Sequence, residues 1–203
     1  MNSGRVISDL PVFFCPEPDT QSPDDDSPDE WVIRKLDGPP AAAFDCGRAE
    51  QTAFFLERAF EDQRARLSVT YCYYFKGMLA AFATICSDAL PLGRRERDRT
   101  IRYQDVGAIK LAQLGVDVRF QGMGLGRLVV ADVIRRARRE CDDVGCRYLT
   151  LDAQPDLVRW YERQGFERNE LRQERRIQEA LAHGRDPARI AVSMRYDLGR
   201  IDH

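Results

Sequence analysis

Three glycines between an apolar run and an amphipathic run constrain the fold of this chain more than any other feature. Gly122, Gly124 and Gly126 follow residues 108–118, which are typical of a strand, and accompany residues 124–142, whose apolar residues recur at helical spacing. Glycine allows a tight turn and lets backbone N–H groups point at one spot. The first turn of a helix adds unsatisfied donors and a partial positive charge, so the segment predicts a pyrophosphate site.

Several kinds of site contain such turns, and the glycines alone leave three interpretations open. A Walker loop is excluded, because no Gly-Lys-Ser or Gly-Lys-Thr follows. A Rossmann dinucleotide site is a rival, since the next strand ends in the acidic residue Asp152. Against it, the spacing is not G-x-G-x-x-G and too little chain follows for a doubly wound sheet. A purely structural turn and a phosphate site of another kind are the other interpretations.

The remaining patterns predict a single domain with a mixed α/β sheet. A hairpin is expected at Lys76-Gly77, where glycine suits the positive φ of a two-residue turn. The expected elements, in chain order, are strand 31–36, helix 48–66, strands 68–75, 78–86 and 108–118, helix 124–142, strand 147–153, helix 156–164, a largely exposed helical segment 169–183 and strand 188–198.

Charge is distributed unevenly between an N-terminal tail and the domain. Residues 1–30 are expected to form a disordered acidic tail before a domain at 31–200, because 16–30 carries seven acidic residues and no basic one. Residues 31–203 hold 30 basic against 25 acidic residues, which suits an anionic ligand but is equally explained by chance. The chain shows neither a secretory signal nor an apolar run of roughly 18 residues, so we expect a cytoplasmic protein without a membrane partner.

Six cysteines raise the question of disulfides or a metal site. No two of them have Cys-x-x-Cys spacing, and the chain has only two histidines. Most of them lie in apolar runs, where a thiol behaves as a small apolar side chain. We therefore expect structural thiols and no metal site. The cysteines are Cys15, Cys46, Cys72, Cys86, Cys141 and Cys146.

The residues around the glycine turn resemble the GNAT superfamily of acetyltransferases. Gln121-x-x-Gly124-x-Gly126 is similar to the family signature Gln/Arg-x-x-Gly-x-Gly/Ala, and an apolar strand precedes it. Downstream, residues 157–166 resemble the closing element of the family, in which a Tyr precedes x-x-x-Gly-Phe. One helix and one strand separate the two motifs, as in the family. The resemblance implies the GNAT fold, N-acetyltransferase activity and acetyl-CoA as the co-substrate.

Other segments resemble one branch of this family. Residues 44–47 (Phe-Asp-Cys-Gly), the pair 55–56 and Ala59 are similar to the start of that branch, and so are residues 145–153. The branch includes toxins of toxin–antitoxin pairs that acetylate the amino group of aminoacyl-tRNA. The resemblance implies acetyl-CoA and an amine acceptor as partners, allows tRNA and an antitoxin as further partners, and allows a homodimer.

The resemblance also assigns roles to individual residues. The residues that would hold acetyl-CoA are Leu114 and Val116 along the pantetheine arm, and Gln121, Gly122, Met123, Gly124, Leu125, Gly126 and Arg127 at the pyrophosphate. A splay after Val116 would aim a backbone N–H at the thioester oxygen. Tyr161 would be the general acid that protonates the leaving thiolate. No general base stands out, and Gln154 stands where the family often has an Asn that helps to bind the cofactor.

The sequence leaves three hypotheses for the function. In the first, the acceptor is the amine of a small metabolite or a protein. In the second, it is aminoacyl-tRNA, favoured by the basic stretch 94–99, although a solvated loop is the commoner interpretation of such a run. In the third, a non-catalytic domain binds acetyl-CoA; the intact Gln121, Gly124, Gly126 and Tyr161 argue against it.

Overall fold

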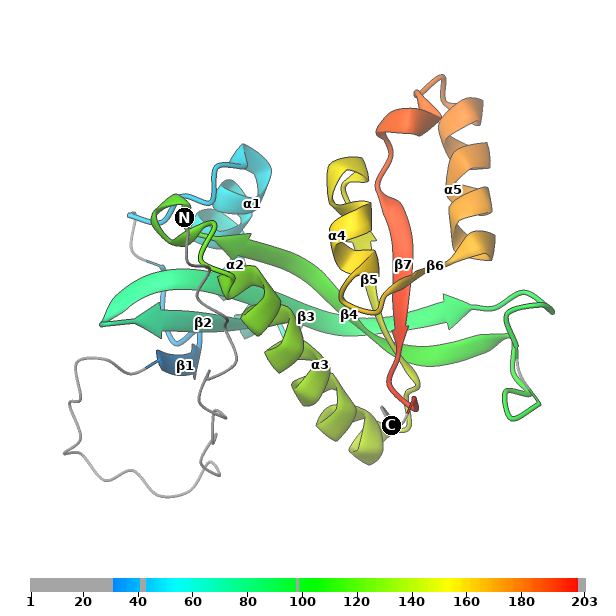
Figure 1. Ribbon diagram of the computed structural model, residues 1–203, viewed down its shortest axis with the longest axis horizontal. Coiled ribbons are helices and arrows are strands. Elements are labelled where there is room, and N and C mark those ends of the chain that lie inside the picture. The colour runs from blue at the N-terminus through cyan, green and yellow to red at the C-terminus, as the bar shows by residue number, and fades with distance from the viewer. Residues whose placement is uncertain (1–30, 41–42, 98, 201–203) are drawn as a thin grey trace, which may run out of the picture.

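The computed structural model describes residues 31–40, 43–97 and 99–200, which form one mixed sheet with helices on both faces (Figure 1). The strand order across the sheet is β1-β2-β3-β4-β5-β7-β6, and only the β4–β5 pair is parallel. The strands are β1 (Trp31–Lys35), β2 (Val69–Phe75), β3 (Met78–Pro91), β4 (Asp105–Val116), β5 (Tyr148–Ala153), β6 (Glu167–Arg168) and β7 (Val192–Asp197). The predicted α/β class is confirmed, and the expected tail lies outside the described residues.

The helices agree with the predicted positions, with local differences. The α-helices are α1 (Ala49–Ala53), α2 (Ala59–Arg64), α3 (Leu125–Val144), α4 (Val158–Glu162) and α5 (Glu170–Ala182). A π-helical turn, Phe54–Arg58, joins α1 to α2. The helix predicted at 48–66 is therefore continuous but contains a π-helical turn between two α-helical parts. Short 3-10 turns, Val118–Phe120, Pro155–Leu157 and Pro187–Arg189, precede α3, α4 and β7.

Alternating side chains divide the helices between the two faces of the sheet. Tyr71 and Tyr73 of β2 belong to the large core that packs against α3 and α4. Cys72, between them, belongs to a second core under α1 and α2, where Phe55 stacks on Phe82 with ring centroids 4.3 Å apart. Helix α5 covers the same face as α1, as Figure 1 also shows.

Strand β4 contains a β-bulge that reverses the faces of its side chains. Thr84 of β3 pairs with Gln113, whereas the next residue, Ile85, pairs with Leu111, so Ala112 is an extra residue on β4. Before Ala112 the odd-numbered side chains of β4 face the large core, and after it the even-numbered ones do. The bulge directs Gln113 to the face of α1 and α5, and it coincides with the point where β4 leaves its parallel neighbour.

The parallel pairing of β4 with β5 covers only the first part of each strand. It joins Ala108–Leu111 to Tyr148–Leu151 and stops at the bulge. The backbone N of Asp117 still bonds the carbonyl of Ala80 on β3, at 2.9 Å. Because successive residues of a strand alternate their hydrogen-bonding direction, the N–H groups of Leu114 and Val116 point away from β3, into the gap beside β5.

The segment 169–183, expected to be largely exposed, is helix α5 and is bonded to the sheet on its inner side. Arg172 Nη1 lies 2.8 Å from an oxygen of Asp88 on β3. Arg176 Nη2 lies 2.7 Å from an oxygen of Asp152 on β5. The N-cap residue, Asn169, has no exposed surface. The expectation was wrong for this side of the helix, because long arginine side chains reach carboxylates of the sheet.

Cys141 and Cys146 form a disulfide, although the sequence predicted structural thiols throughout. Gly145 ends α3 in the left-handed conformation, with φ +73°, and turns the chain back on the last turn of the helix. This return brings the Cα atoms of the two cysteines to 4.6 Å, within reach of a disulfide. Cys15 lies outside the described residues. The free thiols of the described part are Cys46 and Cys72, both buried, and Cys86.

Candidate active site

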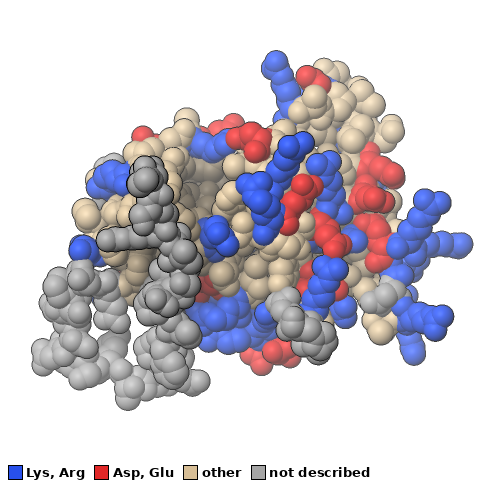
Figure 2. Space-filling view, in the orientation of Figure 1, with Lys and Arg blue, Asp and Glu red and all other residues tan. Residues whose placement is uncertain are grey.

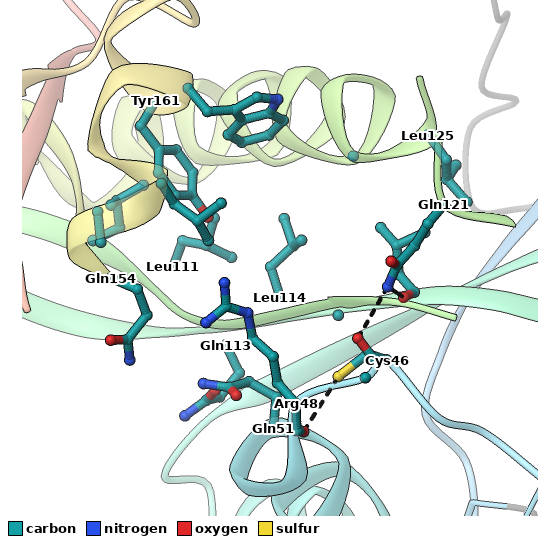
Figure 3. A pocket seen from close by; sticks show the side chains of 18 of the residues that line it. Cys46, Arg48, Gln51, Leu111, Gln113, Leu114, Gln121, Leu125, Gln154 and Tyr161 are labelled. Carbon is teal, nitrogen blue, oxygen red and sulfur yellow. Dashed lines mark hydrogen bonds between the residues drawn. The ribbon is translucent and has the colours of Figure 1, made fainter. Parts of the chain in front are cut away.

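A cavity of about 710 Å³ lies where β4 and β5 separate (Figure 3). Its walls come from the open end of β4, the turn before α3, helix α4, the end of β5 and the segment that leads into α1. Cavities of this volume hold small molecules and cofactors. The glycine turn is therefore joined in space to residues far from it in the sequence.

The glycine turn has the backbone conformation that its sequence predicts. Gly122 and Gly124 have φ of +78° and +83°, and Gly124 is the N-cap of α3. A Cβ at either position would meet no atom within 4 Å, so the positive φ, and not crowding, calls for glycine there. The free space in front of the first turn of α3 leaves its N–H donors accessible to an anion.

Gln121 connects the turn to the rest of the cavity. Its Nε2 donates to the carbonyl oxygens of Cys46 and Val116, both at 2.9 Å. Arg119, which flanks the turn, pairs with Asp117 through Nε and Oδ1 at 2.7 Å. These hydrogen bonds from Arg119, followed by those from backbone N–H groups, hold the pKa of Asp117 below its ordinary value. The turn is thus fixed to the end of β4 by side chains as well as by the backbone.

Tyr161 of α4 is a buried phenol at the edge of this cavity. Only 8% of the residue is exposed, and its ring packs edge-on against Trp160 and Phe166, with centroids 4.8 and 5.6 Å away. Burial raises the pKa of Tyr161 to about 12, and the positive charge of Arg48 opposes this rise. At neutral pH the hydroxyl is therefore protonated and can donate a proton or a hydrogen bond into the cavity.

The wall opposite Tyr161 is polar. Arg48 immediately precedes α1, and its Nη2 lies 2.6 Å from Oδ2 of Asp156, which is 108 residues away in the sequence. Figure 3 shows the Arg48 side chain rising from α1 into the cavity on the side of Gln51 and Gln113. Gln154, at the end of β5, completes this wall. The cavity thus has an arginine and three neutral amides facing a phenol.

Asp152 also lines the cavity; its Oδ2 has two cationic partners, whereas its Oδ1 is buried without a hydrogen-bond partner among the described residues. Lys110 Nζ and Arg176 Nη2 each lie 2.7 Å from its Oδ2. Burial alone would raise the pKa of Asp152, but the hydrogen bonds from Arg176 and Lys110 outweigh burial and lower it. A carboxylate with a lowered pKa is a weaker proton acceptor, so its ion pairs do not favour Asp152 as a general base.

The structure brings most of the predicted site residues together. Those that line the cavity are Leu114, Val116, Gln121, Gly122, Gly124, Leu125, Gly126, Arg127 and Tyr161. Met123 is not among them, and its side chain is exposed. Four further residues that line the cavity were not predicted to have a role: Arg48, Gln51, Gln113 and Trp160. The position of Arg48 directly after the Phe-Asp-Cys-Gly motif is the one signal that pointed to it.

An open strand edge, a glycine turn before a helix and a buried phenol lie together in one cavity, the arrangement that the resemblance to GNAT acetyltransferases implies. Residues 99–179 match the family described as acetyltransferase (GNAT) domain. No curated protein matches the chain. The match covers this part of the chain, and the described chain has the GNAT fold, as predicted.

Solved structures similar to this chain include several toxin–antitoxin proteins. AtaT complexed with acetyl-methionyl-tRNAfMet is 20% identical, with a TM-score of 0.63 over 68% of this chain and 87% of that one. A KacT mutant is 19% identical, with a TM-score of 0.64 over 83% and 95%. AtaTR bound with AcCoA is 20% identical, with a TM-score of 0.56 over 67% and 83%. At these identities the likeness establishes the fold.

The matched domain and the fold support N-acetyltransferase activity with acetyl-CoA as the co-substrate. In the part of the chain that the structure describes, no helix has the length and apolar character needed to cross a membrane. The described residues also contain no cluster of three or more His, Cys, Asp or Glu side chains suited to a metal ion.

Proposed function

We propose that this protein transfers the acetyl group of acetyl-CoA directly to a primary amine, with Tyr161 as the general acid. The observation that carries the proposal is the open edge of β4, which faces the same cavity as the glycine turn and the Tyr161 hydroxyl. The pyrophosphate would bind at the first turn of α3. The pantetheine arm would pair with Leu114 and Val116 in place of the missing strand.

In the chemical step, the lone pair of a neutral amine forms a bond to the thioester carbonyl carbon. The resulting tetrahedral oxyanion would accept a hydrogen bond from the Val116 N–H, which points into the gap. The C–S bond then breaks, and the sulfur takes the proton of the Tyr161 hydroxyl. The surplus proton of the new amide returns to the phenolate, directly or through water, which restores the enzyme.

Replacement of Tyr161 by Phe tests this mechanism. The ring contacts with Trp160 and Phe166 remain, so we expect the variant to fold and to bind acetyl-CoA as the wild type does. Loss of the general acid should lower kcat by about a hundredfold. Calorimetry with acetyl-CoA and single-turnover acetylation separate the two effects. An unchanged kcat would remove Tyr161 from the mechanism.

A second candidate for the acceptor is the amino group of aminoacyl-tRNA, as in toxins of this fold. A specific observation favours it: basic side chains gather on the connection between β3 and β4, which projects from one end of the sheet (Figures 1 and 2). Tyr103 at its end is 77% exposed and offers a ring for base stacking. The exposed arginines there are Arg94, Arg95, Arg99 and Arg102.

Charge reversal of these four arginines to Glu tests the tRNA candidate. If the connection binds the phosphate backbone, acetylation of aminoacyl-tRNA should fall at least tenfold at about 0.1 M salt and depend less on salt. Acetylation of a free amino acid should not change, because the connection lies outside the cavity. Equal loss with both acceptors, or no loss with either, would contradict this candidate and leave a small amine as the acceptor.

A further inference from the structure

The side of the cavity nearest α1 and α5 has a charge pattern that bears on which amine it accepts. Arg48 and Gln51 reach it from α1, and the bulge at Ala112 directs Gln113 to the same side. Tyr161 approaches from the opposite face, that of α3. An acceptor that enters on the α1 side would therefore meet the thioester with its amine toward Tyr161 and its other groups near Arg48.

Two carboxylates beside this entrance already have cationic partners. Asp152 pairs through Oδ2 with both Lys110 and Arg176, and Asp156 pairs with Arg48. Polyamines and lysine-rich segments carry additional ammonium groups that require carboxylates of their own. At this entrance such an ammonium group would compete with Arg48, Lys110 and Arg176 for the same carboxylates and would lose part of its hydration.

Arg48 differs from the other cations because its partner is easily exchanged. The side chains of Arg48 and Asp156 are 43% and 63% exposed, and ion pairs exposed to this degree stabilise a protein little. The guanidinium already points into the cavity (Figure 3). Within it, a guanidinium can bind a carboxylate or phosphate through two parallel hydrogen bonds, which are stronger when water is excluded.

We propose that Arg48 binds an anionic oxygen of the acceptor, next to the reacting amine, and that the enzyme prefers such acceptors to polyamines. The proposal rests on the acetyltransferase function proposed above. Arg48 releases Asp156 and pairs with the incoming oxygen. The neutral amides of Gln51 and Gln113 neither attract nor repel the charge of the acceptor. The oxygen belongs to a carboxylate, as in a free α-amino acid, or to a phosphodiester, as in a 3′-aminoacylated oligonucleotide.

The experiment compares acetylation of L-alanine, L-alaninamide, spermidine and a 3′-alanylated oligonucleotide, all with acetyl-CoA. We expect kcat/KM for at least one anionic acceptor to exceed the values for alaninamide and spermidine by about tenfold or more. Preference for L-alanine identifies a carboxylate as the anion, and preference for the oligonucleotide identifies a phosphodiester. Faster acetylation of spermidine or alaninamide overturns the proposal.

Three variants separate recognition by Arg48 from a structural role of its ion pair. Arg48→Gln should raise the KM of the preferred anionic acceptor by about tenfold, and Arg48→Lys should recover part of the loss. Asp156→Asn should lower that KM, because the competing carboxylate is gone. An ion pair that only supports the fold would make Arg48→Gln and Asp156→Asn change KM in the same direction, which overturns the proposal.

A control and a binding measurement complete the design. Arg168→Gln removes an arginine from a comparable exposed ion pair, with Glu162, outside the cavity and should leave KM unchanged. Acetyl-CoA binding is measured by calorimetry for every variant. If acetyl-CoA binds and neutral amines are the better substrates, only the role of Arg48 fails. If the wild type acetylates none of the four acceptors, the proposed function fails together with it.

Discussion

The two ends of the β4–β5 contact show how one sheet serves stability and binding at once. At the closed end, Ala108–Leu111 pair with β5, and the carboxylate of Asp88 bonds Thr150 and Arg172 across three elements. At the open end, beyond the bulge, β4 presents unpaired backbone to a cavity that ends at Gly124. Changes at the closed end should therefore affect folding, and changes at the open end should affect ligands.

The largest expected effect is at the open end, with Gly124→Glu. The added carboxylate would lie where the pyrophosphate is proposed to bind, so acetyl-CoA affinity should fall at least about a hundredfold by calorimetry. Gly124→Ala is the control, because it imposes the same strain of φ +83° without the charge. Tight binding by the Glu variant, or binding of a nicotinamide or flavin dinucleotide in place of acetyl-CoA by the wild type, would refute this assignment of the turn.

At the closed end we expect Asp88→Ala to lower the free energy of unfolding by about 3 kcal/mol, since it removes the carboxylate to which both Arg172 and Thr150 donate. Acetyl-CoA affinity should stay within about twofold, because Asp88 does not line the cavity. Urea denaturation and calorimetry measure the two quantities. Glu61→Ala, which removes an exposed carboxylate that pairs with Arg64, is the control and should have a much smaller effect. If the Asp88 variant were as stable as the wild type but bound acetyl-CoA more weakly, the closed end would affect ligand binding and not folding, contrary to the expectation.

The closed end should also contribute to the response to acid. Burial alone would raise the pKa of Asp88, but hydrogen bonds from Arg172 and Thr150 outweigh burial and lower it. A carboxylate with a lowered pKa stabilises the fold above its unfolded pKa of about 4, and this contribution is lost as pH falls through the folded value. Urea denaturation from pH 7 to 3 should show stability falling below about pH 4, with the Asp88→Ala variant less sensitive. If the free energy of unfolding fell equally steeply with pH in the wild type and in Asp88→Ala, the role of Asp88 in the acid response would be contradicted.

The sequence was sufficient where a local pattern determines the structure. The hairpin at Lys76-Gly77 and the glycine turn follow from residues that adopt positive φ, and α3 follows from its periodicity. The mixed sheet followed from the order of these elements. Each of these features depends on interactions within a few residues, so a single sequence contains the information.

Features that depend on distant contacts were not predictable in this way. Ala112 is an ordinary strand residue, and only its pairing with β3 reveals the bulge that opens the cavity. Arg48 lines the cavity and bonds Asp156, which lies 108 residues later in the sequence. The Cys141–Cys146 disulfide depends on how Gly145 ends the helix, which the cysteine spacing alone does not indicate.

The smallest expected effect distinguishes two glycines of the same motif. Gly126 lies inside the first turn of α3 without a positive φ, and a Cβ there would lie 3.4 Å from Trp160 Cζ2, an ordinary contact. Gly126→Ala should therefore stabilise α3 by up to about 1 kcal/mol and change acetyl-CoA affinity by no more than about twofold. Urea denaturation and calorimetry, with Gly124→Ala in parallel, test whether the motif needs glycine for conformation at one position only. A large loss of affinity in Gly126→Ala would mean that the cofactor approaches the backbone closely along the whole first turn.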